Sequence, residues 1–149
     1  EIGVRLVGSE MCIRDRIQED GDCTITGSYL LLYRAVYNLV ENAIKYNHPG
    51  GKVTVNIQQK KSLLNAAVSP APADCAFIEV SDTGIGISPE YQEKIFTPFF
   101  RVDKSRSRAM GGAGLGLALV NEIARQHGGE VKVLKSDKNG STIALILPL

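Results

Sequence analysis

Three polar residues recur at helical spacing in the first third of the chain. Asn38, Asn42 and Lys45 are four and three positions apart, so on a helix their side chains form one stripe. Two amide oxygens beside an ammonium group suit a polyphosphate carried by Mg²⁺, because magnesium takes hard oxygen ligands and the lysine offsets phosphate charge. Tyr46, the next residue, could stack on a base. Taken alone, the stripe is better explained as an ordinary solvated helix face.

A second candidate site is a carboxylate that directly precedes two glycines. The segment is Asp82-Thr83-Gly84-Ile85-Gly86, in which the glycines let the backbone approach a flat ligand closely. An ionised aspartate only accepts hydrogen bonds, and the exocyclic amino group of adenine is a donor that matches it. An ordinary Asp-Thr-Gly turn explains the same residues equally well, so the segment by itself leaves both interpretations open.

A glycine-rich segment opens the last predicted helix. Residues 111–117 read GGAGLGL, with four glycines in six positions, and an apolar helical stripe follows them. Free backbone N–H groups at a helix start bind phosphate, so this segment predicts a phosphate cradle. It is not a P-loop, because no Gly-Lys-Ser/Thr follows, and Leu117 stands where a dinucleotide-binding fingerprint has its last glycine.

Aromatic and basic residues come shortly before the glycine-rich segment. Phe96, Phe99 and Phe100 could anchor a lid, and Arg101 follows them directly. An arginine there could stabilise the charge that develops on a transferred phosphoryl group. The further cations between residues 104 and 108 are better explained as a solvated basic loop.

The apolar periodicity around these segments alternates between helix and strand. Ser28 can cap a helix whose apolar residues recur at spacings of three and four, until Asn47 and the glycines after it stop the pattern. The predicted helices cover residues 29–46, 88–96 and the stretch from 115 to the Gly128-Gly129 pair. The predicted strands cover residues 23–25, 53–59, 76–81, 130–135 and 141–147, the last two joined by a turn at Asn139-Gly140. This order predicts a mixed α/β layer fold with surface loops over 60–74 and 99–113, the second of them mobile.

The composition is that of one soluble globular domain. The 149 residues include 44% hydrophobic and 22% charged residues, which argues against disordered, fibrous and membrane-embedded classes. A formal net charge of +1 gives no general attraction for nucleic acid or an anionic bilayer, so neither is expected as a partner. The three cysteines lack C-x-x-C spacing, and no apolar run approaches the roughly 20 residues of a membrane span. We therefore expect a cytoplasmic domain with reduced thiols and no membrane contact of its own; any membrane anchor of the full protein would lie outside this chain.

Taken together and in this order, the segments resemble the sensor histidine kinases and the nucleotide-binding superfamily that they share with DNA gyrase, mismatch-repair ATPases and a heat-shock chaperone. NLVENAIKYN is similar to the N box of the family, DTGIGI to its first glycine box, FTPFFR to its phenylalanine box, GGAGLGL to its second glycine box and NGST to its last. The match covers about residues 17–149, and residues 1–16 are expected to be a linker remnant or an artefact. The resemblance implies a Bergerat-type ATP-binding fold, an α/β (α+β) two-layer sandwich in which helices pack on one face of a mixed sheet.

The same resemblance implies roles for individual residues in binding Mg²⁺ and ATP. Asn42 is implied to ligate Mg²⁺, Asn38 and Lys45 to serve the phosphates, and Tyr46 to flank the nucleotide. Asp82 is implied to bind the adenine amino group. The further nucleotide-binding positions implied are Gly84, Gly86, Gly112, Gly114, Leu115, Gly116, Leu117 and Thr142.

The implied reaction is transfer of the γ-phosphoryl group of ATP to a histidine. Asn38 and Arg101 are the expected catalytic residues, because Arg101 falls where the family places an arginine near the γ-phosphate. No H box precedes the N box, and neither His48 nor His127 resembles a phosphoacceptor. The acceptor histidine is therefore expected on a separate dimerisation domain of the same kinase, with a response regulator as the partner downstream.

Two departures and three alternatives accompany this hypothesis. Ala113 stands where the family frequently has threonine, and the loop over 60–74 is longer than usual. An ATP hydrolase of the gyrase and chaperone type uses a glutamate at the position of Asn38, and an amide cannot act as a general base. A serine kinase of the anti-sigma type generally lacks the phenylalanine box. Asn42 and the intact glycines argue against a non-catalytic nucleotide-sensing module, which the sequence nevertheless leaves open.

Overall fold

The chain forms one β-sheet with its helices on one side. The computed structural model describes residues 14–20, 23–64, 71–101 and 115–149. In chain order the elements are β1 (Arg14–Asp20), α1 (Tyr29–Lys45), β2 (Lys52–Ser62), β3 (Ala73–Asp82), two 3₁₀ turns (Pro89–Tyr91 and Lys94–Phe96), α3 (Gly116–Gln126), β4 (Glu130–Asp137) and β5 (Gly140–Pro148).

The first helix forms where the apolar residues recur at helical spacing. The Ser28 hydroxyl accepts a hydrogen bond from the Leu31 N–H at 3.4 Å and so caps the first turn of α1. The residues that the helix buries are Ala35, Val36, Leu39, Val40 and Ala43. The helix predicted over 29–46 is confirmed to within one residue. In the described part of the chain, no helix combines the length and the apolar character that crossing a bilayer requires.

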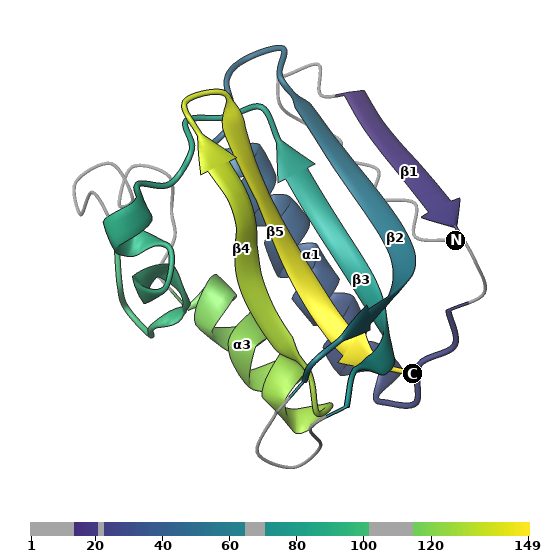
Figure 1. The fold of residues 1–149 in the computed structure, drawn as a ribbon. Coiled ribbons are helices and arrows are strands. Elements are labelled where there is room, and N and C mark those ends of the chain that lie inside the picture. The colour runs from purple at the N-terminus through teal and green to yellow at the C-terminus, as the bar shows by residue number, and fades with distance from the viewer. Residues whose placement is uncertain (1–13, 21–22, 65–70, 102–114) are drawn as a thin grey trace.

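The sheet is mixed, and both long helices cover the same face of it (Figure 1). Its strand order is β1-β2-β3-β5-β4, with β1 parallel to β2 and every other neighbouring pair antiparallel. This arrangement confirms the predicted two-layer sandwich. The loops at one end of the layer connect the strands to the helices, and there the candidate site residues meet.

Alternation along the central strands divides the apolar residues between the two faces of the sheet. The buried strand residues that pack with the helices are Val53, Ile78, Val80, Val131, Ile143, Leu145 and Leu147. The opposite face has a smaller cluster of Cys75, Phe77, Ala144 and Ile146, with Leu64 packed against it. Burial raises the pKa of the Cys75 thiol, which keeps it protonated and unreactive. The main core therefore lies between β3 and β5 on one side and α1 and α3 on the other.

Helix α3 ends at the glycine pair, as predicted. The Gly128 N–H donates to the Arg125 carbonyl at 3.0 Å, and the Gly129 N–H donates to the Ala124 carbonyl at 2.8 Å. Gly128 has φ +72°, which a glycine adopts without strain. This double hydrogen bond satisfies the last carbonyls of the helix and turns the chain into β4.

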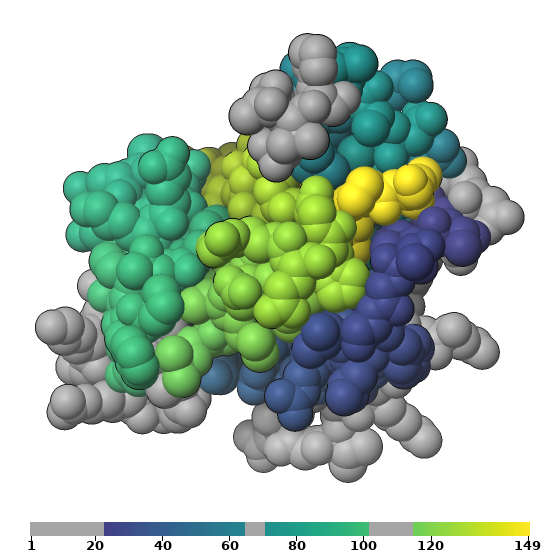
Figure 2. All heavy atoms as spheres, turned by 90° about the horizontal axis from the view of Figure 1, so that it is seen from below, coloured from purple at the N-terminus to yellow at the C-terminus, as the bar shows by residue number. Residues whose placement is uncertain are grey.

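The imidazole of His127 joins the end of α3 to the start of α1. Its Nδ1 lies 2.7 Å from the Ile123 carbonyl, which can only accept, so Nδ1 donates and Nε2 is left to accept the Ser28 N–H at 3.1 Å. A Cβ on Gly27 would collide with the imidazole ring. In Figure 2, which looks at this side of the molecule, α3 lies between the first turn of α1 and the segment of the 3₁₀ turns.

The predicted strand at 23–25 is wrong, because the first strand is β1, which pairs in parallel with β2. Residues 23–25 lie outside any regular element. The side chain of Ile25 packs against the main core, and the chain then bends into the Ser28 cap. The segment is therefore held by core packing and not by pairing with a strand. β1 starts at Arg14 and so crosses the domain boundary predicted after residue 16, and the division of the chain at that point stays a prediction.

The β2–β3 hairpin is longer than predicted. The loop predicted over 60–74 is wrong at both ends, because strand pairing continues to Ser62 opposite Ala73. Lys61 and Asp74 lie opposite each other on this extension and form an ion pair at 3.3 Å. Polar residues thus continue both strands. The prediction followed alternating apolar residues and therefore stopped short of the strand ends. Residues 65–70 lie outside the described residues.

The helix predicted over 88–96 is also wrong, and two short 3₁₀ turns replace it. Ser88 makes no side-chain capping hydrogen bond. The Gln92 side chain donates to the Ile87 carbonyl at 3.1 Å, and the apolar side chains of the second turn pack against the main core. These contacts to the core hold the segment without a continuous helical ladder.

We predict that Leu39→Ala lowers the free energy of unfolding by roughly 2 to 5 kcal/mol, because the side chain is 1% exposed at the centre of the core. Leu30→Ala is the matched control on the same helix: Leu30 is 63% exposed, so its loss should stay within about 0.5 kcal/mol. Urea denaturation of both variants measures the difference. Equal losses would contradict the packing of α1 described here.

Candidate functional site

Asp82 lies where β3 ends and the chain turns toward the helices. One of its carboxylate oxygens, Oδ1, accepts hydrogen bonds from the Gly84 N–H at 2.8 Å and the Ser141 N–H at 3.3 Å. Among the residues that the structure describes, both partners of Asp82 use this oxygen, so Oδ2 keeps its capacity to accept. Burial raises the pKa of the Asp82 carboxyl above its ordinary value, and the two N–H groups lower it in part.

The turn that follows β3 is packed between two other stretches of backbone. A Cβ on Gly84 would collide with the carbonyl oxygen of Tyr46, at the end of α1, and a Cβ on Gly86 would collide with that of Asp137, at the end of β4. Gly86 also has φ +75°, a conformation that other residues rarely adopt. The Ile85 N–H donates to the Tyr46 carbonyl at 3.2 Å. Glycine is therefore required at both positions by neighbouring backbone, independently of any ligand.

The polar stripe of α1 runs from the start of α3 toward this turn. Asn38 donates through Nδ2 to the carbonyl one turn earlier at 2.9 Å, and its Oδ1 would lie 3.2 Å from a Cβ on Gly116. Asn42, Lys45 and Tyr46 follow along the helix and are half-buried. In the described part of the chain the Asn42 amide makes no hydrogen bond, so its oxygen is available to a ligand.

Helix α3 starts at the last glycine of the glycine-rich segment. Gly116 is its first residue, and the N-cap residue Leu115 has no side chain that could cap the free N–H groups. Leu117 packs against the main core beside them. The helix start is thus suited to an anion. Gly112, Ala113 and Gly114 lie outside the described residues, as does the predicted mobile loop beyond Arg101.

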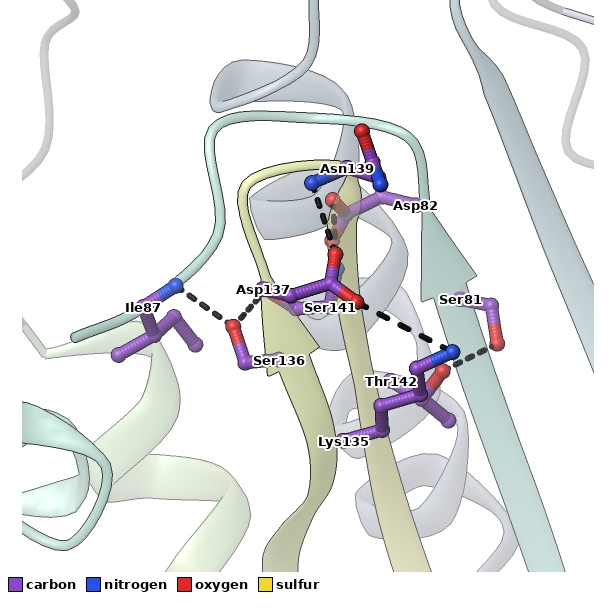
Figure 3. Close-up of polar contacts among 9 residues, drawn as sticks. All are labelled: Ser81, Asp82, Ile87, Lys135, Ser136, Asp137, Asn139, Ser141 and Thr142. Atoms are coloured by element: carbon purple, nitrogen blue, oxygen red, sulfur yellow. Dashed lines mark hydrogen bonds and ion pairs between the residues drawn. The ribbon is translucent and has the colours of Figure 1, made fainter. Parts of the chain in front are cut away.

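The β4–β5 hairpin closes the other side of the Asp82 turn (Figure 3). The Ser136 hydroxyl accepts the Ile87 N–H at 2.6 Å and shares a hydrogen bond of 2.9 Å with the Ser141 hydroxyl. The Ser141 N–H in turn reaches Asp82. The hairpin therefore holds both ends of the turn.

Thr142 does not join this group of residues. Its hydroxyl pairs with that of Ser81 at 2.8 Å (Figure 3). Successive side chains of a strand point to opposite faces, and Ile143 packs with the helices, so Thr142 lies on the other face of the sheet. Ser141, one residue earlier, shares the helix-covered face with Asp82.

Sequence reasoning missed two site residues, which are the two buried polar side chains of the described part of the chain. Asn47 is 8% exposed and Ser141 is 7% exposed. Asn47 was interpreted only as the residue that stops a helix, and Ser141 only as the start of a strand. Asn47 is nevertheless the last residue of the N box, and Ser141 lies in the last glycine box, so their place in these motifs was the signal that could have found them.

The aromatic segment before Arg101 is only partly anchored. Phe96 packs against the main core, and the ring centroids of Tyr91 and Phe100 are 5.7 Å apart. Phe99 is 71% exposed and has φ +63°, a strained conformation for a bulky residue. Arg101 is half-buried at the end of the segment.

The residues present fit a divalent cation only as a partner of phosphate. Among the described residues, no three His, Cys, Asp or Glu side chains gather into a metal site. A cation here would take its ligands from an amide oxygen, phosphate oxygens and water, which is how Mg²⁺ is usually bound beside a nucleotide. The Asn42 amide, which makes no hydrogen bond to the described residues, suits that role.

Known proteins resemble the chain in sequence and in fold. Residues 27–149 match the family of histidine kinase-, DNA gyrase B- and HSP90-like ATPases. The chain is 40% identical over 136 residues to the sensor-like histidine kinase SenX3 of Mycobacterium tuberculosis, which covers 91% of this chain. The solved structure of the mycobacterial sensor histidine kinase MprB superposes with a TM-score of 0.71 at 30% identity, over 91% of this chain and 81% of that chain. Full-length ShkA in complex with AMPPNP superposes with a TM-score of 0.70 at 25% identity, over 92% of this chain and 26% of that chain.

The matched region includes every described residue of the site. The chain spans 30% of the length of SenX3, so the likeness concerns one part of that kinase. The chain belongs to the histidine kinase-, DNA gyrase B- and HSP90-like ATPase family and is homologous to the ATP-binding catalytic domain of sensor histidine kinases.

Proposed function

We propose that this chain binds ATP with Mg²⁺ and passes the γ-phosphoryl group to a histidine on a separate dimerisation domain of the same kinase. The observation that carries the proposal is the position of Asp82. Its carboxylate is held by two backbone N–H groups with one oxygen left to accept, in a turn bonded to the end of the helix that carries Asn42. An acceptor for a base and a polar stripe for phosphates thus adjoin one another.

The base would lie at the sheet end of the site. Asp82 would accept a hydrogen bond from the adenine amino group, and Tyr46 would flank the base. Gly84 and Gly86 keep this turn free of side chains. The resemblance placed Thr142 here, but because its side chain lies on the other face of the sheet, we propose Ser141 in that role.

The phosphates would lie between α1 and the start of α3. Lys45 supplies positive charge, and Asn38 approaches Gly116 at the first turn of α3. The N–H groups after Leu115, together with Gly112, Gly114 and Leu117 of the same segment, would form the cradle. Mg²⁺ bound by Asn42 and the phosphates would neutralise charge on the transferred group.

Asn38 favours phosphoryl transfer over ATP hydrolysis. Activation of water requires a general base, and a neutral amide cannot take up the proton. In this structure the Asn38 amino group is already engaged with the backbone of its own helix, at 2.9 Å. Asn38 therefore serves as a polar contact for phosphate, and Arg101 is the residue proposed to stabilise the transition state.

The phosphoacceptor would come from another domain. His127 uses both ring nitrogens in hydrogen bonds to the backbone, so neither is free to attack a phosphorus atom. His48 is exposed beyond the C-terminal end of α1. We propose that the acceptor domain of the same kinase docks in the cytoplasm with residues 17–149 as the donor domain, and that a response regulator takes the phosphoryl group afterwards.

We predict that Asp82→Asn weakens ATP binding about ten- to a hundred-fold, since it removes a charge-assisted hydrogen bond. Because burial raises the pKa of Asp82, its ionisation opposes folding once the pH exceeds the ordinary carboxyl range. The nucleotide-free variant should therefore be no less stable than the parent in urea at pH 7. Thr142→Val is the matched control for calorimetry and should bind ATP like the parent. Parent-like ATP binding by Asp82→Asn would remove Asp82 from the site.

We predict that Asn42→Ala abolishes the part of ATP affinity that depends on magnesium. The parent should bind ATP more tightly with Mg²⁺ than with chelator, and the variant should bind equally under both conditions, because the amide oxygen is the proposed ligand. Titration calorimetry in the two buffers gives the comparison. A parent protein that is indifferent to Mg²⁺ would contradict the metal assignment.

We predict that the chain phosphorylates a separately supplied cognate dimerisation domain while neither labelling itself nor hydrolysing ATP appreciably. Positioning supplies much of the rate of phosphoryl transfer, so the donor without its acceptor should be nearly silent. Radiolabelled ATP and the two proteins are mixed, and acid-labile, base-stable label is scored. Arg101→Ala should reduce transfer more than ATP binding. Rapid ATP hydrolysis by the chain alone would place it with the hydrolases of its family.

A further inference from the structure

Asn47, Thr83 and Lys52 close a hydrogen-bonded triangle behind the proposed nucleotide site. The Thr83 hydroxyl donates to Asn47 Oδ1 at 3.1 Å and accepts the Lys52 N–H at 2.8 Å. Asn47 Nδ2 completes the triangle by donating to the Lys52 carbonyl at 2.9 Å. The Thr83 N–H donates to that same carbonyl at 3.2 Å. We call this set the clamp.

The clamp joins the end of α1, whose polar stripe would contact the phosphates, to the turn in which Asp82 would contact the base. Asn47 directly follows Tyr46 at the end of α1, and Thr83 directly follows Asp82 at the end of β3. Lys52 is the first residue of β2, so the clamp also ties both to the sheet. A shift of Asp82 relative to α1 would have to break at least one of these hydrogen bonds.

The orientation of the Asn47 amide is fixed by its partners. Its oxygen accepts both the Thr83 hydroxyl and the His48 N–H, the latter at 2.9 Å, and its amino group donates to the Lys52 carbonyl. Reversing the amide would lose the bonds to the His48 N–H, which can only donate, and to the carbonyl, which can only accept. A Cβ on Gly51 would collide with the Asn47 oxygen, so the backbone also closes over the amide. Because Asn47 itself is buried, leaving its amide without these partners would be costly.

Adenine and guanine differ in what they offer to a carboxylate. Adenine presents an amino donor where guanine presents a carbonyl acceptor, but guanine has another amino donor elsewhere on its ring. A carboxylate that could move relative to the phosphate-binding helix would reach that donor and accept either base. A carboxylate at a fixed distance from the helix rejects guanine, because its buried acceptor then faces an oxygen.

We infer that Asn47 and Thr83 are positioning residues that set the preference of this site for adenine over guanine. The inference rests on the proposed function, because it presupposes that Asp82 reads the base. Neither residue is proposed to touch the nucleotide. They act by holding Asp82 in register with the stripe of Asn42 and Lys45.

The test is the ratio of affinities for Mg²⁺–ATP and Mg²⁺–GTP, measured by competition against a fluorescent ATP analogue. Thr83→Val removes the hydroxyl and keeps the shape; Thr83 is exposed, so the variant should fold. The ATP-to-GTP preference should fall about three- to ten-fold, the range expected for the hydrogen bond from Thr83 to Asn47, which is the one in the clamp that ties the turn to the end of α1. Thr83→Ser retains the hydroxyl and should retain the preference. Asn47→Ala should lower the preference in the same direction, which provides a second variant.

The possible outcomes separate the two proposals. A preference that is unchanged in Thr83→Val, or ATP and GTP affinities that fall equally, would overturn the inference and leave Asp82 in its role. A parent protein that fails to bind ATP would overturn the proposed function itself. A fall in preference with Thr83→Val and its recovery with Thr83→Ser is the result expected.

Discussion

The site depends on how closely the turn after Asp82 is held between the end of α1 and the β4–β5 hairpin. Backbone approaches at Gly84 and Gly86 leave no room for a Cβ, and hydrogen bonds from Ile85 and Ile87 fasten the turn on both sides. The main core fixes the distance between the two layers beneath it. The carboxylate at the end of β3 and the polar stripe of α1 are therefore held in a fixed arrangement, in which both could face one ligand.

The fixed turn holds the Asp82 carboxylate in a buried position where its negative charge is unfavourable. Burial raises the pKa of Asp82, so the ionised carboxylate that would accept from a base makes the nucleotide-free fold less stable. The N–H groups of Gly84 and Ser141 offset part of that penalty on one oxygen and leave the other for a ligand. The second oxygen of Asp82 would thus be fully satisfied only when a ligand donates a hydrogen bond to it. This requirement would favour a base with an amino group at that point, such as adenine.

Much of the fold could be predicted from the spacing of apolar residues and from capping residues. The elements that were predicted wrongly differ for physical reasons. The helix from Ser28 and the glycine ending of α3 were predicted correctly, because local sequence determines both. The extension of the β2–β3 hairpin was missed because polar cross-strand pairs such as Lys61 and Asp74 continue it. The 3₁₀ turns after Ser88 were mistaken for a helix because contacts to the core hold them.

The sequence predicted those residues of the candidate site that a motif marks, such as Asp82. It did not predict those whose position depends on contacts between distant parts of the chain. The face of the sheet on which Ser141 and Thr142 lie depends on strand register, and the burial of Asn47 depends on a turn far along the chain. Neither can be read from local pattern. The motif thus predicted Asp82, whereas the roles of Ser141 and Asn47 follow from how the Asp82 turn packs against α1.

The most direct test of this account is a crystal structure of the chain with Mg²⁺ and a non-hydrolysable ATP analogue. We expect the adenine amino group within hydrogen-bond distance of Asp82 Oδ2, and the metal on the amide oxygen of Asn42. The hydrogen bonds from Gly84 and Ser141 to the other oxygen of Asp82 should be unchanged. A base bound elsewhere, or a metal with no contact to α1, would contradict it.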